Sequence, residues 1–279
     1  MRENQRACPE RLPRAKPTGS RRVGGVDLGS RTTKLVILER GEARLRDLKV
    51  VAFDITDTAP DIADRALKLL EGHDPARIVA TGYGRHLAAA HFAHEVITEI
   101  TAYALAARHL FPDCRTVIDV GGQDSKAIAL DERGGCRRFE MNDRCAAGTG
   151  RFLEIMARAL GFSTESFGDA ALEAEGAVAI SSTCTVFAES EVISLLAQGQ
   201  DAHSIALGIH EAIADRLVAM VRRIGVQPEV VFAGGVAHNP CIARLLGERL
   251  GLDIRIPDNP QIVGALGAAL HAAQLEAGQ

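Results

Sequence analysis

The chain has 279 residues, of which 47% are hydrophobic and 24% charged, and its formal net charge is −4. This length allows one large domain or two of medium size, each able to bury a core. The weakly acidic balance argues against nucleic acid or an anionic membrane as a partner. No stretch of about 18 apolar residues occurs that could span a bilayer. We therefore predict a soluble cytoplasmic protein.

Residues 1–22 form a basic, proline-containing segment that lacks the apolar stretch of a secretory signal. We expect it to be a flexible, solvated tail. A contact between its arginine cluster and nucleic acid or another partner is the alternative.

A strand–turn–strand pattern occurs twice in the chain at a constant offset of 92 residues. The first copy comprises predicted strands at 23–28 and 34–38, and the second comprises strands at 116–120 and 126–130. The aligned residues are Asp27 with Asp119, Gly29 with Gly121, and Lys34 with Lys126. A shared offset without a gap indicates a duplication.

The residues of this repeat suit a nucleotide with magnesium. A glycine in a tight turn lets backbone N–H groups approach an anion closely, and residues 30–33 add hydroxyl and guanidinium donors. Asp27 and Asp119 end their strands just before the turns, where paired carboxylates can hold hydrated Mg²⁺. Two such hairpins facing each other across a cleft would clamp a phosphate tail. Two ordinary hairpins with solvent-facing aspartates are the alternative.

A third glycine site follows a predicted strand at 229–232. Gly234 and Gly235 lead from this strand into a helix that runs to residue 250, a pattern that lets backbone pass close to a ring or ribose. The consensus of a P-loop is absent, and Gly148-Thr149-Gly150 lacks the third glycine of a dinucleotide fingerprint.

Strands and helices alternate in the rest of the chain. We predict a strand at 77–80 and helices at 97–110, 202–224 and 261–275. Hairpins followed by α/β crossovers, twice over, predict an α/β protein with two related halves.

Two of the six cysteines precede predicted helices. Cys145 stands before a helix that Gly161 ends, and Cys184 directly before one that ends near Gly199. The positive end of a helix dipole stabilises a thiolate and an anionic cluster bound to it. Two thiolates do not complete an iron–sulfur site, but a two-fold homodimer would supply four. Two capped helices with incidental cysteines are the alternative. The other four cysteines, Cys8, Cys114, Cys136 and Cys241, are expected to be buried or surface thiols.

Six motifs carry a resemblance: GVDLGSRTTK (25–34), VGGQDSK (120–126), MNDRCAAGTG (141–150), CTVFAESEVIS (184–194), AGGVA (233–237) and QIVGALGAAL (261–270). From about residue 23 to 275 the chain closely resembles the activator ATPases, or component A, of 2-hydroxyacyl-CoA dehydratases. That family includes ATPase subunits of benzoyl-CoA reductase and reductases of double-cubane-cluster proteins. The motifs with cysteine are specific to it, whereas the phosphate loops are shared with the wider actin, sugar-kinase and heat-shock-chaperone superfamily.

The resemblance implies the duplicated, two-lobed ATPase fold of that superfamily. It places the first lobe at residues 23–113 and the second at 114–279, with the helix at 261–275 packing back on the first. It also implies a homodimer in which Cys145 and Cys184 of both chains hold one 4Fe–4S cluster.

The resemblance further implies the ligands of ATP. The phosphate-binding set would be Ser30, Arg31, Thr32, Thr33, Lys34, Gly121, Gly122, Gln123 and Asp124. Asp27 and Asp119 would hold magnesium and its waters, with Gly234, Gly235 and Gln261 near the nucleoside. Gln123 or Asp124 would position the attacking water. Arg31 replaces a small hydroxyl residue common in relatives, and Arg144 replaces the usual lysine, which leaves the subgroup and its partner open.

By the same resemblance, the protein would be an ATP hydrolase coupled to electron transfer. Reduced ferredoxin or flavodoxin would give the cluster one electron, and ATP hydrolysis would change the angle between the two helices that follow the cysteines. The electron would pass to a 2-hydroxyacyl-CoA dehydratase, a benzoyl-CoA reductase or a double-cubane-cluster protein. A small-molecule kinase and a nucleotide-dependent assembly protein are the alternatives from other classes, and neither needs both cysteines.

Overall fold

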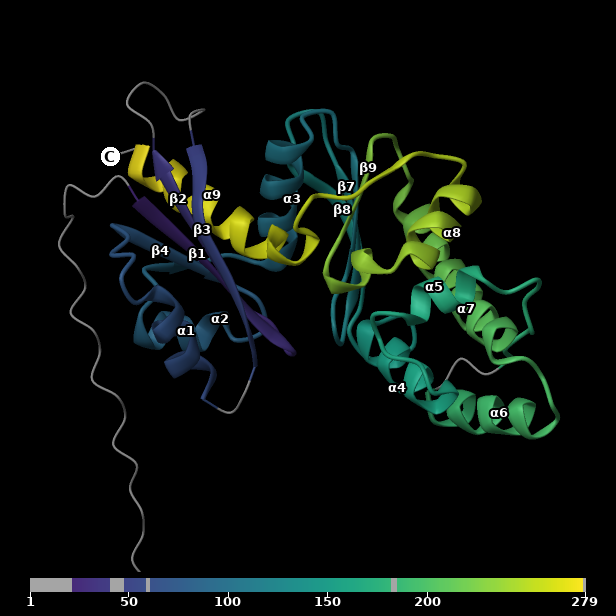
Figure 1. The fold of residues 1–279 in the computed structure, drawn as a ribbon. Coiled ribbons are helices and arrows are strands. Elements are labelled where there is room, and N and C mark those ends of the chain that lie inside the picture. Colours follow the sequence, from purple (N-terminus) through teal and green to yellow (C-terminus); the bar gives the residue numbers. More distant parts are fainter. Residues whose placement is uncertain (1–21, 41–47, 59–60, 182–184, 278–279) are drawn as a thin grey trace, which may run out of the picture. The chain divides into compact units, whose positions relative to one another are not determined.

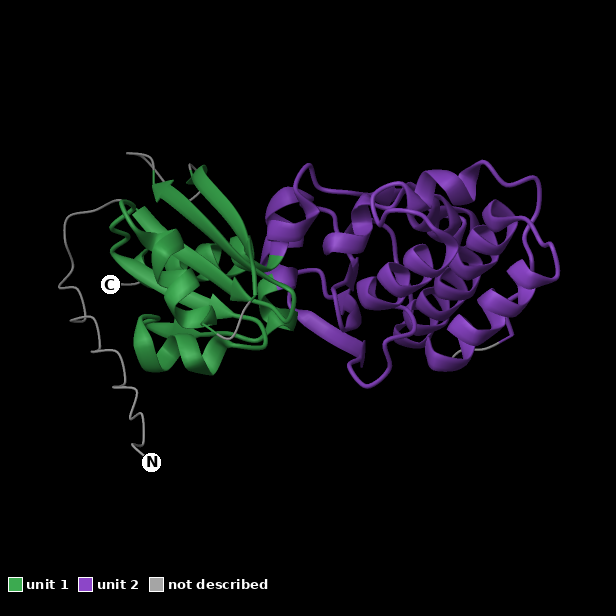
Figure 2. Cartoon of the chain, turned by 60° about the horizontal axis from the view of Figure 1, so that its bottom comes forward, with its two compact units in different colours: residues 1–102, 264–279 green, residues 103–263 purple. Residues whose placement is uncertain are grey.

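The computed structural model describes residues 22–40, 48–58, 61–181 and 185–277. Cys184, Cys8 and most of the basic N-terminal segment lie outside the described residues. The chain divides into two compact units (Figure 2): unit 1 takes its residues from 1–102 and 264–279, and unit 2 comprises residues 103–263.

Unit 1 is built on a five-stranded sheet with the order β3-β2-β1-β4-β5 (Figure 1). Its strands are β1 (Arg22–Leu28), β2 (Thr32–Arg40), β3 (Leu48–Asp57), β4 (Arg77–Thr81) and β5 (Glu95–Val96). β1 pairs antiparallel with β2 and parallel with β4. Helices α1 (Ile62–Leu70) and α2 (Arg85–His91) bring Ala66 and Ala88 against the apolar side chains of β1 and β2.

Helix α9 (Val263–Ala277), which follows the short helix η2 (Pro260–Ile262), also belongs to unit 1. It packs so closely on β1 that a side chain at Gly25 would collide with the backbone of Ala265 and Ala269. Arg77 pairs with Glu276 at 2.6 Å, and Arg40 donates to the carbonyl of Ala273 at 3.0 Å. The last helix is thus held by the first, second and fourth strands of the sheet.

Unit 2 repeats this sheet with the order β10-β9-β6-β7-β8. The strands are β6 (Thr116–Val120), β7 (Ser125–Leu130), β8 (Cys136–Asn142), β9 (Val230–Ala233) and β10 (Ile254–Arg255). β6 pairs antiparallel with β7 and parallel with β9, as β1 does with β2 and β4. The duplication predicted from one hairpin is confirmed and extends to the whole sheet.

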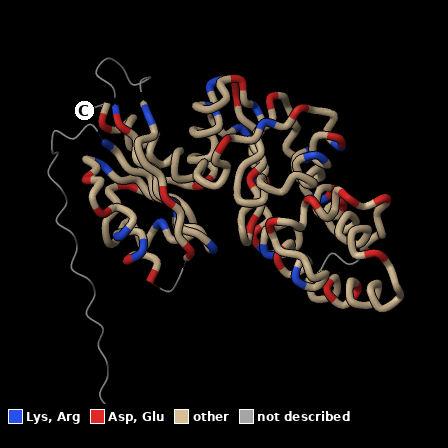
Figure 3. The backbone as a smooth tube through the Cα atoms, in the orientation of Figure 1, with Lys and Arg blue, Asp and Glu red and all other residues tan. Residues whose placement is uncertain are grey.

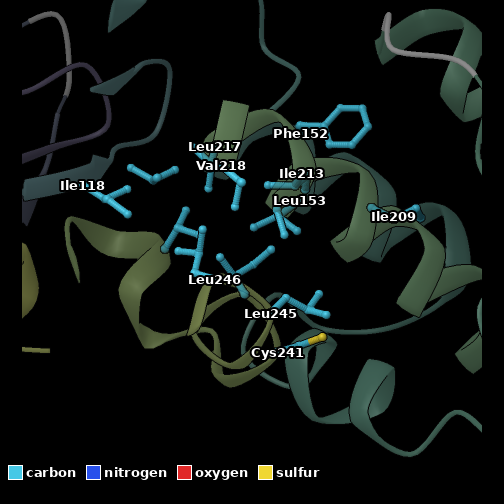
Figure 4. Close-up of a cluster of buried hydrophobic side chains, with 14 of the residues drawn as sticks. Ile118, Phe152, Leu153, Ile209, Ile213, Leu217, Val218, Cys241, Leu245 and Leu246 are labelled. Atoms are coloured by element: carbon cyan, nitrogen blue, oxygen red, sulfur yellow. The ribbon is translucent and has the colours of Figure 1, made fainter. Parts of the chain in front are cut away.

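The helices of the second half are α3 (Glu99–Leu110), α4 (Gly150–Leu160), α5 (Phe167–Leu172), α6 (Thr185–Ala197), α7 (Ala202–Ile224), η1 (Gly235–His238) and α8 (Pro240–Leu250). The predicted helix at 202–224 is confirmed, with Asp201 accepting from the amide of Ser204 at its start. Figure 4 shows Ile118 of β6 and the apolar side chains of α4, α7 and α8 meeting in one buried cluster. No helix in the described ranges is long and apolar enough to cross a membrane.

Charged residues of both signs are interspersed over each unit (Figure 3). A different kind of surface occurs on α6, where Val186 and Phe187 are each 68% exposed and Ile193 is 56% exposed. Large apolar side chains at this exposure on one helix are typical of a surface that another protein covers.

A buried histidine joins α7 to the start of α8. The Nδ1 atom of His210 lies 2.7 Å from the carbonyl oxygen of Ala206, and its Nε2 atom lies 2.9 Å from the side-chain nitrogen of Asn239. Asn239 in turn accepts from the amide of Ile242 and caps α8. These partners fit a neutral ring that donates from Nδ1 and accepts at Nε2. Burial lowers the pKa of His210 to about 4.

This histidine predicts a pH-dependent stability. The unfolded chain takes up the proton near pH 6.5, whereas folded His210 does so only near its pKa of about 4. Its contribution is therefore complete above pH 6.5 and is lost progressively as the pH falls toward 4. We expect the free energy of unfolding to drop by about 2 kcal/mol between pH 7.5 and 5 from this group. Urea unfolding at the two pH values measures it.

His210→Gln should remove most of that pH dependence, even if it also lowers stability at pH 7.5. His86→Gln, which alters an exposed histidine, is the control and should leave the dependence unchanged. An equal pH dependence in both variants would contradict the role given to His210.

Candidate functional site

The two hairpins of the repeat have the same backbone geometry. In β1–β2 the amide of Gly29 donates to the carbonyl of Thr32 at 3.1 Å, and in β6–β7 the amide of Gly121 donates to that of Asp124 at 2.9 Å. Asp27 faces Lys34 across the first pair of strands, and Asp119 faces Lys126 across the second.

Each of these cross-strand pairs is an ion pair. Lys34 Nζ lies 3.1 Å from Asp27 Oδ2, and Lys126 Nζ lies 3.1 Å from Asp119 Oδ2. Both aspartates are buried, and in each the other oxygen, Oδ1, has no hydrogen-bond partner among the described residues. A buried carboxylate oxygen without a partner costs more than about 1–3 kcal/mol. A hydrated Mg²⁺ ion, which prefers carboxylate oxygens and water, fits both positions.

A glycine keeps the space beside each free oxygen open. Gly82 follows β4 with φ +88°, and Gly234 follows β9 with φ +86°. A Cβ atom at Gly82 would collide with Oδ1 of Asp27, and one at Gly234 with Oδ1 of Asp119. Gly234 is predicted from the sequence, but its counterpart Gly82 is missed. The signal was present, because each glycine follows a short apolar strand directly.

The hydroxyl of Thr81 is a second feature that the sequence did not reveal. Thr81 is the β4 neighbour of Asp27, it is fully buried, and its Oγ1 atom has no partner within the described part of the chain. In unit 2 the corresponding neighbour of Asp119 is Ala233. The polar surroundings of the two aspartates therefore differ.

Opposing influences act on Asp119. Burial raises the pKa of its carboxyl most strongly and the negative charge of Asp124 adds to this, whereas the ammonium of Lys126 lowers it. Lys126 also lies 2.7 Å from Asp124 Oδ2, so that one ammonium serves two carboxylates. This lysine keeps buried Asp119 and half-buried Asp124 together.

The predicted phosphate ligands of unit 1 lie in and after the first turn. Arg31 is exposed, and Ser30 and Thr32 are half-buried. Thr33 is buried instead, and its hydroxyl lies 3.4 Å from that of Thr58. Its side chain lies on the opposite face of β2 from that of Lys34, because neighbouring residues of a strand alternate.

The predicted ligands of unit 2 come together from distant parts of the sequence. The amide of Gly234 donates to the carbonyl of Pro260 at 3.0 Å, and a Cβ atom at Gly235 would lie 3.1 Å from the side-chain nitrogen of Gln261. Gly234 also borders Asp119, which leads into Gly121 and Gly122. Gln123 is exposed at the tip of that turn.

Cys145 lies in the loop between β8 and α4. Its side chain is half-buried against the core of unit 2, and its carbonyl accepts from the side-chain nitrogen of Asn142 at 2.9 Å. Helix α4 begins five residues later, where the amides of Gly150 and Arg151 donate to the carbonyls of Gly121 and Gly122 at 2.9 Å each. The first two amides of α4 are therefore engaged by the β6–β7 turn.

Cys184, the other predicted cluster ligand, lies outside the described residues. In the ranges that are described, no three or more histidine, cysteine or acidic side chains form a group that could hold a metal ion. Cys114 and Cys241 are buried, and burial raises the pKa of their thiols to about 12 and about 11.

Comparison with known proteins assigns the chain to a family. The profile of the BadF/BadG/BcrA/BcrD ATPase family matches residues 25–272. The chain belongs to this family. The 2-hydroxyisocaproyl-CoA dehydratase activator of Clostridioides difficile is 42% identical over 254 residues, which cover 89% of this chain and 93% of the relative.

Solved structures agree with the family. Component A of (R)-2-hydroxyglutaryl-CoA dehydratase from Acidaminococcus fermentans superposes with a TM-score of 0.85 at 39% identity, covering 92% of this chain and all of the other. The C. difficile activator with bound ADPNP superposes with a TM-score of 0.84 at 40% identity, covering 92% and 96%. A glucokinase of the ROK family from Streptomyces griseus, with a TM-score of 0.58 at 13% identity, covers 91% and 99% and shares the fold alone. The predicted α/β ATPase fold of actin, sugar kinases and heat-shock chaperones is confirmed.

The glycines beside the aspartates give a test of the site. Gly82→Ala and Gly234→Ala should each lower affinity for a non-hydrolysable ATP analogue about tenfold or more, because the new methyl group collides with the aspartate and with the carbonyl of the residue that follows it, Leu28 or Val120. The controls are Gly72→Ala and Gly161→Ala, whose glycines also have φ of +80° but have nothing within 4 Å of a Cβ atom. Alanine is strained at all four positive-φ positions, and most at Gly234, whose ψ is 173°. Calorimetric titration should show weaker binding of the analogue by the two test variants than by the two controls. Equal affinities in all four variants would contradict a role for Asp27 and Asp119.

Proposed function

We propose that this protein is an ATP-dependent one-electron activator of a 2-hydroxyacyl-CoA dehydratase. Two copies would share one 4Fe–4S cluster, and ATP hydrolysis would drive a low-potential electron from the cluster to the partner enzyme. Reduced ferredoxin or flavodoxin would supply that electron. The relatives described above support this proposal, because they are named as activators of such dehydratases.

The observation that carries the proposal is the contact between the second phosphate turn and the start of α4. Gly150 and Arg151 bond directly to the carbonyls of Gly121 and Gly122, with no side chain between them. The loop that carries Cys145 ends at this junction. A nucleotide that binds two shapes of the turn with different affinity would therefore shift the segment of Cys145 as well.

The residues of the chain fit a shared cluster in two respects. Cys145 is half-buried rather than sealed in the core, and it lies in a loop pinned by Asn142. Val186 and Phe187, which follow Cys184 in the sequence, present exposed apolar surface that a second copy would cover. Cys145 and Cys184 would each supply one thiolate per chain, and the cluster would supply a site for a single electron.

ATP would bind through the two hairpins and the third glycine site. Ser30, Arg31, Thr32, Lys34, Gly121 and Gly122 would contact phosphates, and Gly234, Gly235 and Gln261 would lie near the nucleoside. Asp27 and Asp119 would hold magnesium and its waters, and Gln123 or Asp124 would orient the attacking water. The unpartnered oxygens of the two aspartates support the magnesium assignment.

Anaerobic purification with Cys145→Ser tests the proposal. The wild-type dimer should be brown, contain roughly two irons per chain, hydrolyse ATP and activate a 2-hydroxyacyl-CoA dehydratase in the presence of a reductant. Cys145→Ser should lose the iron and the activation while it still binds ATP. Cys136→Ser, which changes an exposed thiol on β8, is the matched control and should behave as wild type.

Three outcomes would contradict the proposal. A wild-type protein that stays colourless after anaerobic reconstitution would exclude the shared cluster. Retention of a full cluster by Cys145→Ser would show that the ligand assignment is wrong. Transfer of the γ-phosphate to an acceptor, rather than release of free phosphate, would indicate a kinase instead.

A further inference from the structure

The two hairpins share a backbone but differ in the side chains of their turns. The turn hydrogen bond and the 3.1 Å Asp–Lys pair occur in both. The three residues that follow the turn glycine differ between the units. Ser30, Arg31 and Thr32 in unit 1 correspond to Gly122, Gln123 and Asp124 in unit 2. Because the backbones agree, these side chains give the two turns different chemistry.

In unit 2, Asp124 gives the lysine a second carboxylate partner. Its Oδ2 atom lies 2.7 Å from Lys126 Nζ, and Lys126 is only 1% exposed. If this ammonium turned toward a ligand, it would leave two carboxylates uncompensated, one of them fully buried. Lys126 is therefore fixed. In unit 1 Thr32 occupies the position of Asp124, and Lys34 is 13% exposed and has Asp27 as its acidic partner.

The space over the glycine of each turn shows the same contrast. Where a Cβ atom would point from Gly29, the nearest side-chain atom is the ammonium nitrogen of Lys34, at 3.0 Å. At the corresponding point of Gly121 it is the carboxylate Oδ1 of Asp124, at 2.9 Å. One turn presents a cation at this point and the other an anion. Exposed Arg31, which replaces the neutral Gln123, adds to the positive charge of the first turn.

We propose that the lysines of the two duplicated hairpins have different roles toward ATP. Lys34 makes the phosphate contact proposed above, whereas Lys126 is a positioning residue that contacts no nucleotide and holds the side chains of Asp119 and Asp124 in place. An ammonium is a point-charge donor that suits phosphate oxygens. Paired carboxylates repel a phosphate and attract its counter-ion instead. This division of roles rests on the ATP binding proposed above.

Exchange of Thr32 and Asp124, the residues that differ two positions before each lysine, tests this division of roles. Thr32→Asp gives Lys34 a second carboxylate, as in unit 2, and Asp124→Thr gives Lys126 the single-carboxylate arrangement of unit 1. Because each variant copies an arrangement that the chain already contains, both are expected to fold. The measurements are calorimetric binding of a non-hydrolysable ATP analogue with magnesium, and the rate of phosphate release, on the anaerobic full-length protein.

Thr32→Asp should weaken binding of the analogue about tenfold or more, and Lys34→Met should weaken it similarly. Asp124→Thr should keep the affinity within about threefold of wild type, or tighten it, yet slow hydrolysis at least about tenfold. Val51→Asp at the far end of β3 and Glu132→Gln in the β7–β8 turn change the charge of each unit by the same amount. These controls should leave both quantities unchanged.

Binding of the analogue by Thr32→Asp or Lys34→Met as tightly as by wild type would overturn the assignment of Lys34. Loss of affinity in Asp124→Thr equal to that in Thr32→Asp would overturn the assignment of Lys126. A wild-type protein that binds no ATP analogue would refute the proposed function itself. Wild-type binding and hydrolysis with no contrast between the reciprocal variants would refute the division of roles alone.

Discussion

An aspartate and a lysine face each other across the first two strands of each sheet, and the rest of the site depends on this pair. Antiparallel register fixes the two side chains on one face, and burial makes the carboxylate depend on the ammonium. The lysine satisfies one carboxylate oxygen and leaves the other facing a glycine of the neighbouring parallel strand. Each sheet thereby holds one buried carboxylate oxygen without a partner at the end of its central strand.

The turn at the end of β6 also determines which neighbouring segment a bound ligand can move. In unit 2 the turn after Asp119 accepts hydrogen bonds from the first two residues of α4, and a Cβ atom at Gly150 would lie 3.2 Å from the carbonyl oxygen of Gly121. Such close packing leaves little room for the turn and the helix to move independently. The loop of Cys145, which ends at this junction, is therefore placed to respond to the state of the turn.

The sequence predicted those features whose residues are close together in the chain. The two hairpins share one offset, so Asp27, Asp119 and both turns could be identified by alignment. Gly82 and Gly234 are equivalent in the two sheets but are separated by 152 residues rather than 92, because the connections in unit 2 are longer. No constant offset could pair them. Their role depends on parallel strand pairing, which only the folded chain shows.

Other features that the sequence did not reveal have a similar origin. The burial of Thr33 follows from its pairing with Thr56 of β3, and the engagement of the α4 amides follows from the return of that helix to the β6–β7 turn. Gly25 similarly reads as part of a phosphate motif, although its small size serves the packing of α9. Local pattern identifies the chemical groups, whereas long-range packing decides which of them face a ligand.

The most direct test of the account is hydrogen exchange of the anaerobic protein with ADP and with a non-hydrolysable ATP analogue. Amides in residues 29–34 and 121–126 should be protected by either nucleotide with magnesium. The amides of Gly150 and Arg151 should exchange at different rates in the two states, because their acceptors belong to the second turn. Protection of the turns without any difference at Gly150 and Arg151 would contradict the link between nucleotide and the cysteine loop.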